Sequence, residues 1–247
     1  SQTEETRAVW VPVMSLQMNG EGEAAFQKKF DEIIATSLEK GMNTLIVHVR
    51  PFGDSFYPSE YFPWSHALSG TQGVDPGYDP LAYMVEAAHK AGLAIHAWVN
   101  PLRIQASSTP SILSQHNPYT LWQGDSEKKD WTVKTDSGIY YNPAIPEVRS
   151  YIADGVAEIV EKYPVDGVQF DDYFYPTQDE SFDETAYQTY CEQAKKDGYS
   201  ALSLSQWRKA NINALVSLVY QKIKEVNPKT VFGISPQGNL SNNDALG

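Results

Sequence analysis

The sequence predicts an α/β fold, namely a (β/α)8 barrel of the TIM type, of which this chain supplies about the first five β/α units. Short runs of branched and aromatic residues alternate with longer segments whose apolar residues recur at three and four positions, the order of parallel strands and covering helices. The connections after the helices are short and those after the strands are long, as in barrels whose βα loops build the working face. We therefore interpret residues 1–247 as the N-terminal part of a single barrel domain.

The elements follow one another in a regular order. Five strands are expected, roughly over residues 8–13, 44–50, 94–100, 165–171 and 231–235. Helices are expected between them, near residues 23–40, 80–91, 147–163 and 205–226. Gly41 and Gly92 follow two of these helices, where a residue with positive φ ends a helix at little cost.

Three long connections follow strands and are expected to line a substrate groove: 51–79, 101–146 and 172–204. The second is expected to carry a hairpin about Asp136-Ser137-Gly138, with strands over 131–135 and 139–142. The third is expected to include a helical patch near 183–196, which would act as a small lid or subdomain.

The length of the chain and the number of predicted strands lead to different conclusions about whether the barrel is complete. A complete eight-unit barrel takes about 250 residues, but the long loops leave room for only five units in this chain. Because an open sheet edge exposes unpaired backbone groups, three further strands are expected to close the barrel. We expect this C-terminal barrel segment from the same natural chain, or from another polypeptide.

The composition describes an acidic globular chain. Acidic residues outnumber basic ones 31 to 19, the net charge is -12, and 41% of the residues are hydrophobic. Nucleic-acid binders concentrate Lys and Arg on one face, so a nucleic-acid partner is not expected and a neutral or amino-sugar ligand suits the chain better. No run approaches the ~18 apolar residues of a membrane span, and none is predicted. A lone cysteine, Cys191, excludes an intrachain disulfide.

Alternation of side chains sorts each predicted strand into two faces. The aliphatic residues share one face, which suits burial under the outer helices. The other face is expected to send polar and ring-bearing side chains into the barrel interior: His48, Arg50, His96, Trp98, Asn100, Gln169 and Asp171. The last residues of four strands should gather at one pole, where the catalytic groups of such barrels lie: Arg50, Asn100, Asp171 and Ser235.

The same pattern has a structural alternative, a polar layer in which Arg50 pairs with Asp171 and Asn100 satisfies a turn. His48 lies deeper and fits a hydrogen-bonded core histidine better than a base. Trp98 can fill the barrel centre or act as a sugar platform. Most loop aromatics are expected to serve packing, with two or three of them stacking on sugar rings: Tyr57, Trp64, Trp122, Trp131 and Tyr141.

Asp171 and Asp172 suggest the carboxylate pair that glycoside hydrolysis needs. Adjacent strand residues point to opposite faces, so we assign Asp171 as the nucleophile or base and expect Asp172 to brace the loop or accept from backbone amides. The proton donor would come from a loop or from the remaining strands. Arg50 is expected to orient Asp171 and keep it ionised, because a nearby cation lowers the pKa of a carboxyl group.

Ordered sequence blocks extend along nearly the whole chain: Arg7-Ala8-Val9-Trp10, Val49-Arg50-Pro51 through Gly53-Asp54 to Tyr57-Pro58-Ser59, Pro76-Gly77-Tyr78-Asp79-Pro80-Leu81, His96-Ala97-Trp98-Val99-Asn100-Pro101 with Arg103, Asn142-Pro143 with Pro146-Glu147-Val148-Arg149, Asp166-Gly167-Val168-Gln169-Phe170-Asp171-Asp172-Tyr173-Phe174-Tyr175-Pro176 and Phe232-Gly233-Ile234-Ser235-Pro236. These blocks resemble the glycosyl-hydrolase-10-like family of bacterial cell-envelope proteins. That family contains division-site glycosidases that cleave peptidoglycan strands stripped of their stem peptides.

The resemblance implies an extracytoplasmic glycoside hydrolase without an obligatory cofactor, and peptide-free peptidoglycan strands are the expected substrate. Asp171 and Asp172 form the acidic signature of the family. Asn100 and Arg103 would hold sugar hydroxyl, N-acetyl or lactyl groups. The full set of expected glycan-binding residues is Arg50, Tyr57, His96, Trp98, Asn100, Arg103, Tyr141, Asn142, Tyr173 and Ser235.

Two other function classes are open. A non-catalytic glycan-binding protein can use the same scaffold, since a fold does not guarantee chemistry. A metal-dependent hydrolase would draw on His48, His96, Asp171 and Asp172, but the sequence offers neither a His-x-His pair on a strand nor a helical His-Glu-x-x-His, so no metal ligand is assigned. A nucleophilic serine is not supported either, because Gly-x-Ser-x-Gly does not occur.

Overall fold

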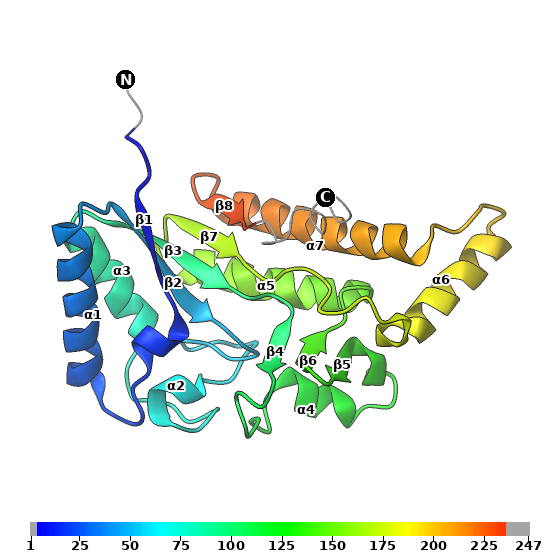
Figure 1. Ribbon diagram of the computed structural model, residues 1–247, viewed down its shortest axis with the longest axis horizontal. Helices are drawn as coiled ribbons and strands as arrows, with labels where there is room; N and C mark the ends of the chain where they lie inside the picture. Colours follow the sequence, from blue (N-terminus) through cyan, green and yellow to red (C-terminus); the bar gives the residue numbers. More distant parts are fainter. Residues whose placement is uncertain (1–3, 236–247) are drawn as a thin grey trace.

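The structure, a computed structural model, describes residues 4–235 and confirms the predicted architecture of a partial α/β barrel (Figure 1). Five parallel strands form one sheet in the order β1-β2-β3-β7-β8, so each strand lies beside the preceding strand of this sheet. Their bounds are Ala8–Val11, Thr44–Arg50, Ala94–Val99, Gly167–Phe170 and Val231–Ile234. Sequential neighbours joined by helical crossovers are the arrangement that curves into a barrel.

Four helices cover one face of this sheet: α1 (Glu23–Glu39), α3 (Pro80–Lys90), α5 (Pro146–Lys162) and α7 (Leu204–Val226). In Figure 1, α1 lies beside α3 and α5 lies along α7, and both pairs are in contact. Local sequence sets where two of these helices begin. Asp79 caps α3 by accepting from the Ala82 amide, and Ser203 forms a capping box with Gln206 at the start of α7.

The two faces of the sheet differ as the alternation predicted. The apolar side chains on one face of β2, β3 and β7 are fully buried under the helices: Leu45, Val47, Val49, Ile95, Ala97, Val99, Val168 and Phe170. The opposite face is only partly covered. Trp10 on β1 is 41% exposed and Val231 on β8 is 51% exposed. Their strand pairing places both on this inner face, which points away from the helices.

The long connection after β3 confirms the predicted hairpin and enlarges it. Strands β5 (Thr132–Thr135) and β6 (Gly138–Tyr141) are antiparallel, and β4 (Arg103–Ala106) pairs with the other side of β6 to make a three-stranded sheet. A Cβ atom at Gly138 would lie 2.0 Å from the Gln105 carbonyl oxygen, so only glycine fits this crossing. The sequence did not predict β4, since Arg103–Ala106 has a single large apolar residue, Ile104, and shows no clear alternation.

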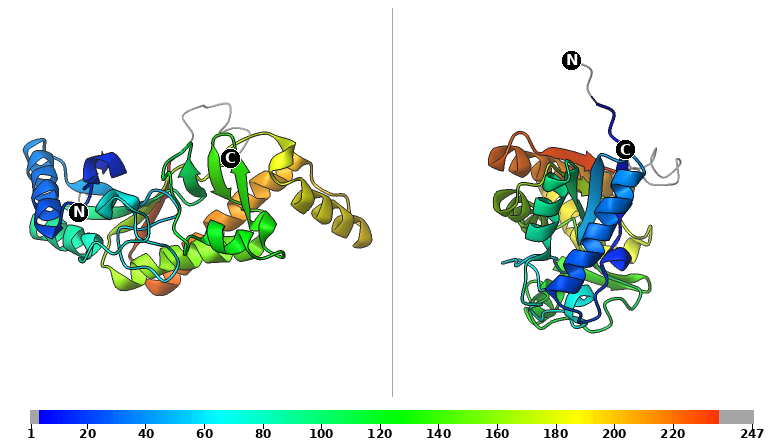
Figure 2. Two further views of the ribbon diagram at one scale, coloured as in Figure 1. Left: turned by 90° about the horizontal axis from the view of Figure 1, so that it is seen from below. Right: turned by 90° about the vertical axis from the view of Figure 1, so that its left-hand side faces the viewer.

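Short elements were also missed, namely α2 (His66–Ser69), α4 (Pro118–Gln123) and the 3-10 turns η1 (Val13–Leu16), η2 (Lys129–Trp131) and η3 (Glu180–Phe182). The helical patch after β7 is confirmed as α6 (Glu184–Lys196), which reaches away from the sheet (Figure 2). Its base is fixed by a buried ion pair, with Arg208 of α7 donating to Asp183 at 2.6 Å. None of the helices within residues 4–235 is long and apolar enough to cross a bilayer.

Candidate active site

Side chains from three strands meet at the carboxyl ends of β2, β3 and β7. Asn100 directly follows β3, and its amide donates to the Arg50 carbonyl oxygen at the end of β2, at 3.0 Å. Asp171 directly follows β7, and its amide donates to the Val99 carbonyl oxygen at 3.2 Å. The backbone ladders therefore place these residues at one pole of the partial barrel, where catalytic groups lie in such folds.

Asn100 is the hub of this pole, and its side-chain orientation is fixed. The Val13 amide donates to His48 Nδ1 at 3.1 Å, so the ring proton lies on Nε2, which donates to Asn100 Oδ1. Arg103 Nη2 donates to the same oxygen at 3.1 Å. Asn100 Nδ2 consequently faces the acidic loop, where it donates to the Asp171 carbonyl oxygen at 3.3 Å and to Asp172 Oδ2 at 3.4 Å.

His48 is a neutral core histidine, as the sequence indicated. Burial lowers its pKa to about 3, and the hydrogen bond to Asn100 opposes this shift only in part. Its ring stacks on Trp98 with centroids 3.7 Å apart, and Trp98 also meets Trp10 edge to face. Trp98 therefore fills the inner face of the sheet, which was one of its two expected roles.

Asp172 turns toward the same opening as Asp171. The alternation argument failed here because β7 ends at Phe170, and Asp172 itself adopts a positive φ of 51°. This left-handed conformation is tolerated by Asp better than by most residues. Asn100 and Arg103 Nη1 both contact Oδ2 of the carboxylate, at 3.4 Å each, which fits the first of its two expected roles, bracing the loop, rather than acceptance from backbone amides.

Asp171 is partly buried, and its pKa is raised above the ordinary value of a carboxyl group. Burial is the main cause and the charge of Asp172 adds to it, whereas the Asp172 backbone amide and the charge of Arg103 act in the opposite direction. Desolvated carboxyl groups with a neighbouring charge are typical of sites that exchange protons with a substrate.

The expected pairing of Arg50 with Asp171 is wrong. The register of β2 against β3 shifts between His48 and Arg50, so the Arg50 side chain does not follow the alternation of the strand. Its guanidinium is buried, donates to the carbonyl oxygens of Phe52 and Pro101 at 2.7 Å each, and lies 4.6 Å from the centre of the Phe62 ring. Arg103 is the cation that acts on Asp171 and Asp172.

Three other predicted contact residues are packed inside the protein rather than at this opening. Tyr57 and Tyr141 are 0% exposed, and their rings contact Tyr163 and Trp122 respectively. Asn142 is 1% exposed and donates to the Asp130 carbonyl oxygen at 3.0 Å. Tyr57 thus packs on Tyr163 just after α5, whereas Tyr141 and Asn142 at the end of β6 contact α4 and η2.

The remaining predicted residues lie near the pole or below it. Gln169 Nε2 lies 3.3 Å from His96 Nδ1 on the inner face, and Tyr173 packs on Phe174. Ser235 directly follows β8, and its amide donates to the Phe170 carbonyl oxygen at 2.9 Å. Two glycines make room for this layer. A Cβ atom at Gly167 would lie 2.7 Å from the His96 ring, and one at Gly233 would lie 2.4 Å from Gln169.

The metal-dependent alternative can be compared with the same geometry. Within residues 4–235, no three side chains of His, Cys, Asp or Glu come together in a way that could hold a metal ion. Of its four suggested ligands, His48 already uses both ring nitrogens in hydrogen bonds.

Comparisons with known proteins agree with this fold and sequence pattern. The profile of the family described as glycosyl hydrolase-like 10 matches residues 5–246. Glycosyl hydrolase YngK of Bacillus subtilis is 41% identical over 239 residues, covering 95% of this chain and 45% of that protein. Glycosyl hydrolase DigH of Escherichia coli is 36% identical over 249 residues, covering 98% of this chain and 56% of that protein. The chain thus spans about half the length of these relatives.

Solved structures share the fold at low identity. An alpha-L-fucosidase, isoenzyme 2 of Paenibacillus thiaminolyticus, aligns with a TM-score of 0.61 and 16% identity over 93% of this chain and 32% of its own. The glycoside hydrolase domain of PgaB from Bordetella bronchiseptica aligns with a TM-score of 0.58 and 12% identity over 93% of this chain and 64% of its own. The family profile and the two relatives show that the chain belongs to the glycosyl hydrolase-like 10 family.

Proposed function

We propose that the protein is a glycoside hydrolase acting on a bacterial cell-envelope glycan, with peptide-free peptidoglycan strands as its substrate and Asp171 as nucleophile or base. The observation that carries this proposal is the desolvated Asp171 carboxyl group at the strand-end pole, beside Asp172 and next to Arg103. The printed names of YngK and DigH, both glycosyl hydrolases, support the reaction class.

The neighbours of Asp171 have distinct roles in this proposal. Asn100 makes four side-chain hydrogen bonds, two as acceptor and two as donor, so it positions the acidic loop rather than binding sugar. Arg103 is 20% exposed in its side chain, and its bond to Asp172 is long at 3.4 Å. Its guanidinium therefore suits a second contact with a hydroxyl, N-acetyl or lactyl group of the substrate.

A second carboxyl group must face Asp171 across the bond that is cut. Retaining enzymes hold the two groups about 5 Å apart, and inverting enzymes hold them about 6.5–9.5 Å apart. Asp172 is braced by Arg103 and Asn100, so we assign the proton donor to a loop or to the remaining barrel segment. We propose that three further β/α units of the natural chain close the barrel over Trp10 and Val231, and that the protein works outside the cytoplasm.

The experiment uses the full-length natural protein and purified peptide-free peptidoglycan strands. New reducing ends should appear with the wild type, and Asp171→Asn should lower kcat by about 10²–10⁴-fold, the usual contribution of a proton-transferring group. Equal rates for both proteins would remove Asp171 from the mechanism. Saturable binding without new reducing ends in the wild type would instead support the non-catalytic glycan-binding alternative.

A further inference from the structure

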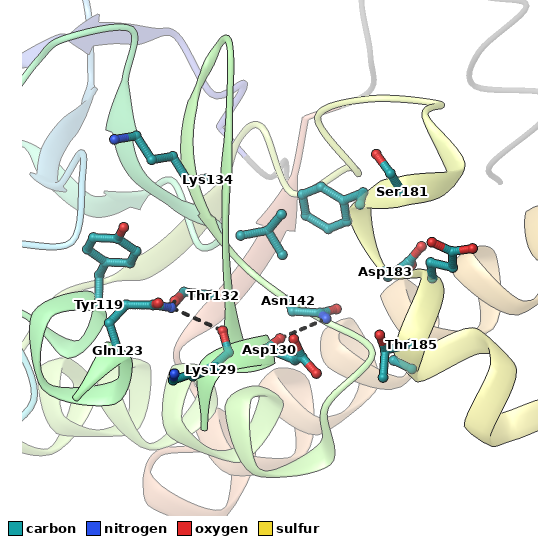
Figure 3. A pocket seen from close by; sticks show the side chains of 14 residues that line it. Tyr119, Gln123, Lys129, Asp130, Thr132, Lys134, Asn142, Ser181, Asp183 and Thr185 are labelled. Atoms are coloured by element: carbon teal, nitrogen blue, oxygen red, sulfur yellow. Dashed lines mark hydrogen bonds between the residues drawn. The ribbon is translucent and has the colours of Figure 1, made fainter. Parts of the chain in front are cut away.

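A groove separates the hairpin from the segment that leads into α6. Two cavities, of about 280 Å³ and about 510 Å³, share the lining residues Val133, Lys134, Ser181 and Phe182. In Figure 3, Tyr119, Gln123 and Lys129 lie on one side of the first cavity, and Ser181, Asp183 and Thr185 lie on the other. Because the two cavities share residues of both walls, they lie next to each other, and together we call them the hairpin groove.

The hairpin groove lies between the connections that leave β3 and β7, the strands whose ends carry Asn100 and Asp171. Pro176, which lines it, is five residues after Asp171. Five residues of extended chain span about 18 Å at most. The near end of the groove is therefore within reach of a glycan of a few sugar units that extends from the strand-end pole.

Both walls are fixed before any ligand binds. On one side, Gln123 Nε2 donates to the Lys129 carbonyl oxygen at 3.0 Å and to Thr132 Oγ1 at 3.1 Å, and Trp122 packs edge to face on Trp131. On the other side, Arg208 holds Asp183 and donates to the Asp179 carbonyl oxygen at 2.8 Å. A groove with walls held in this way is pre-formed, as small-molecule sites usually are.

The lining matches a sugar chain better than an apolar ligand or an anionic polymer. The lining mixes donors and acceptors, with ammonium groups on Lys129 and Lys134, carboxylates on Asp130 and Glu184, and a hydroxyl on Thr185. Val133 and Phe182 supply an apolar contact where the two cavities meet. Mixed hydrogen-bonding groups beside apolar surface suit pyranose rings, which carry hydroxyl and N-acetyl groups at their edges and C–H bonds on their faces.

We propose that the hairpin groove binds N-acetylated sugar units of a glycan chain at a distance from the bond that is cut. This inference rests on the proposed function for the direction in which the glycan extends from the strand-end pole. The hairpin groove itself does not include Asp171. The inference predicts that affinity depends on glycan length, because only a long chain reaches from the pole into the groove.

The test places bulk in the groove without touching the pole. Thr185 lies in the first turn of α6 and lines the groove, whereas Thr189 lies one turn further on the same helix and does not line it. In the full-length protein, Thr185→Tyr should raise the Kd of an N-acetylglucosamine hexasaccharide roughly 10-fold, because part of its contacts with the groove is lost. Calorimetry measures this change. Binding of the disaccharide should not change, and Thr189→Tyr should behave as the wild type.

A second variant removes a charge while keeping most of the side-chain volume. Lys134→Met should also weaken hexasaccharide binding, with Lys196→Met on the exposed end of α6 as its control. Equal affinity of the wild type and Thr185→Tyr for the hexasaccharide would overturn the inference, as would the same loss for both glycan lengths or no glycan binding by the wild type. Length-dependent binding without hydrolysis would contradict only the proposed catalytic function and would still support glycan binding in the groove.

Discussion

Two arginines near the ends of neighbouring strands have opposite roles. Arg50 at the end of β2 donates to two backbone carbonyl oxygens at 2.7 Å, and its guanidinium is buried against the Phe62 ring. Arg103, three residues after Asn100, donates to the Pro51 carbonyl oxygen at 2.8 Å and reaches Asn100 and Asp172 with its other nitrogens. Arg50 joins the loops that follow β2 and β3, whereas Arg103 joins those loops to the acidic residues.

The difference arises from one irregularity in the sheet. His48 pairs with Trp98 in register, but Arg50 pairs with Val99, so β2 holds one extra residue at this point. Shifting a strand by one residue sends its side chains to the other face, and a bulge does so locally. A charged residue at a strand end is therefore part of a site only if the register persists to that end.

The largest expected effect concerns Arg50 and stability. Arg50→Met should lower the free energy of unfolding by about 3–5 kcal/mol, because it leaves the buried carbonyl oxygens of Phe52 and Pro101 without donors. Chemical denaturation of the wild type and the variant measures this difference. A loss below about 1 kcal/mol would mean that Arg50 does not hold the loops, and the contrast with Arg103 would disappear.

The next effect is the pH dependence of stability that His48 causes. In the unfolded chain its pKa is near 6.5, whereas burial lowers the pKa in the folded protein to about 3. Between these values only the unfolded chain takes up the proton, so His48 lowers stability as the pH falls from 6.5, by roughly 1.4 kcal/mol per pH unit. Denaturation of the wild type and His48→Gln between pH 4.5 and 6.5 should give a steeper slope for the wild type, and equal slopes would contradict the neutral, buried assignment.

The smallest change in stability is expected at Arg103, where the effect on chemistry is larger. Arg103→Met should cost about 1 kcal/mol or less, since the side chain is partly exposed. Its positive charge lowers the pKa of Asp171, so its removal should raise that pKa further. If Asp171 acts as nucleophile or base, activity is lost as the pH falls through the pKa of Asp171. The acidic limb of the pH-rate profile should therefore move to higher pH.

The control variant is Arg103→Lys, which retains the charge and should keep the acidic limb closer to that of the wild type. An unchanged limb in Arg103→Met would separate Arg103 from Asp171.

Much of the fold was predictable because hydrophobic periodicity and strand alternation extend over whole elements. The five strands, the four covering helices and the strand-end positions of Asn100 and Asp171 all follow from these patterns. The direction of the Arg50 side chain was not predictable, because a β-bulge cannot be recognised from the alternation of apolar and polar residues. The turn of Asp172 toward Asn100 depends on one positive φ angle just beyond β7.

The loops after β3 and β7 were predicted to line a groove, but the residues that line the hairpin groove, apart from Asn142, were not singled out. The walls of the groove come from the loops after β3 and β7, and the second wall is held by the buried pair of Arg208 and Asp183, residues 25 positions apart in the chain. Polar residues in such loops resemble solvent-exposed residues in the sequence. Only their three-dimensional arrangement distinguishes a lining residue such as Thr185 from its neighbour Thr189 on the same helix.

The most direct test of the account is a crystal structure of the full-length Asp171→Asn protein with a peptidoglycan glycan bound. The account predicts that the residue 171 side chain lies about 3–3.5 Å from the reacting sugar, the separation of groups poised to react, and that Arg103 contacts the same chain. A glycan bound at the opposite pole of the barrel, or one whose glycosidic bonds all lie beyond the reach of residue 171, would contradict it.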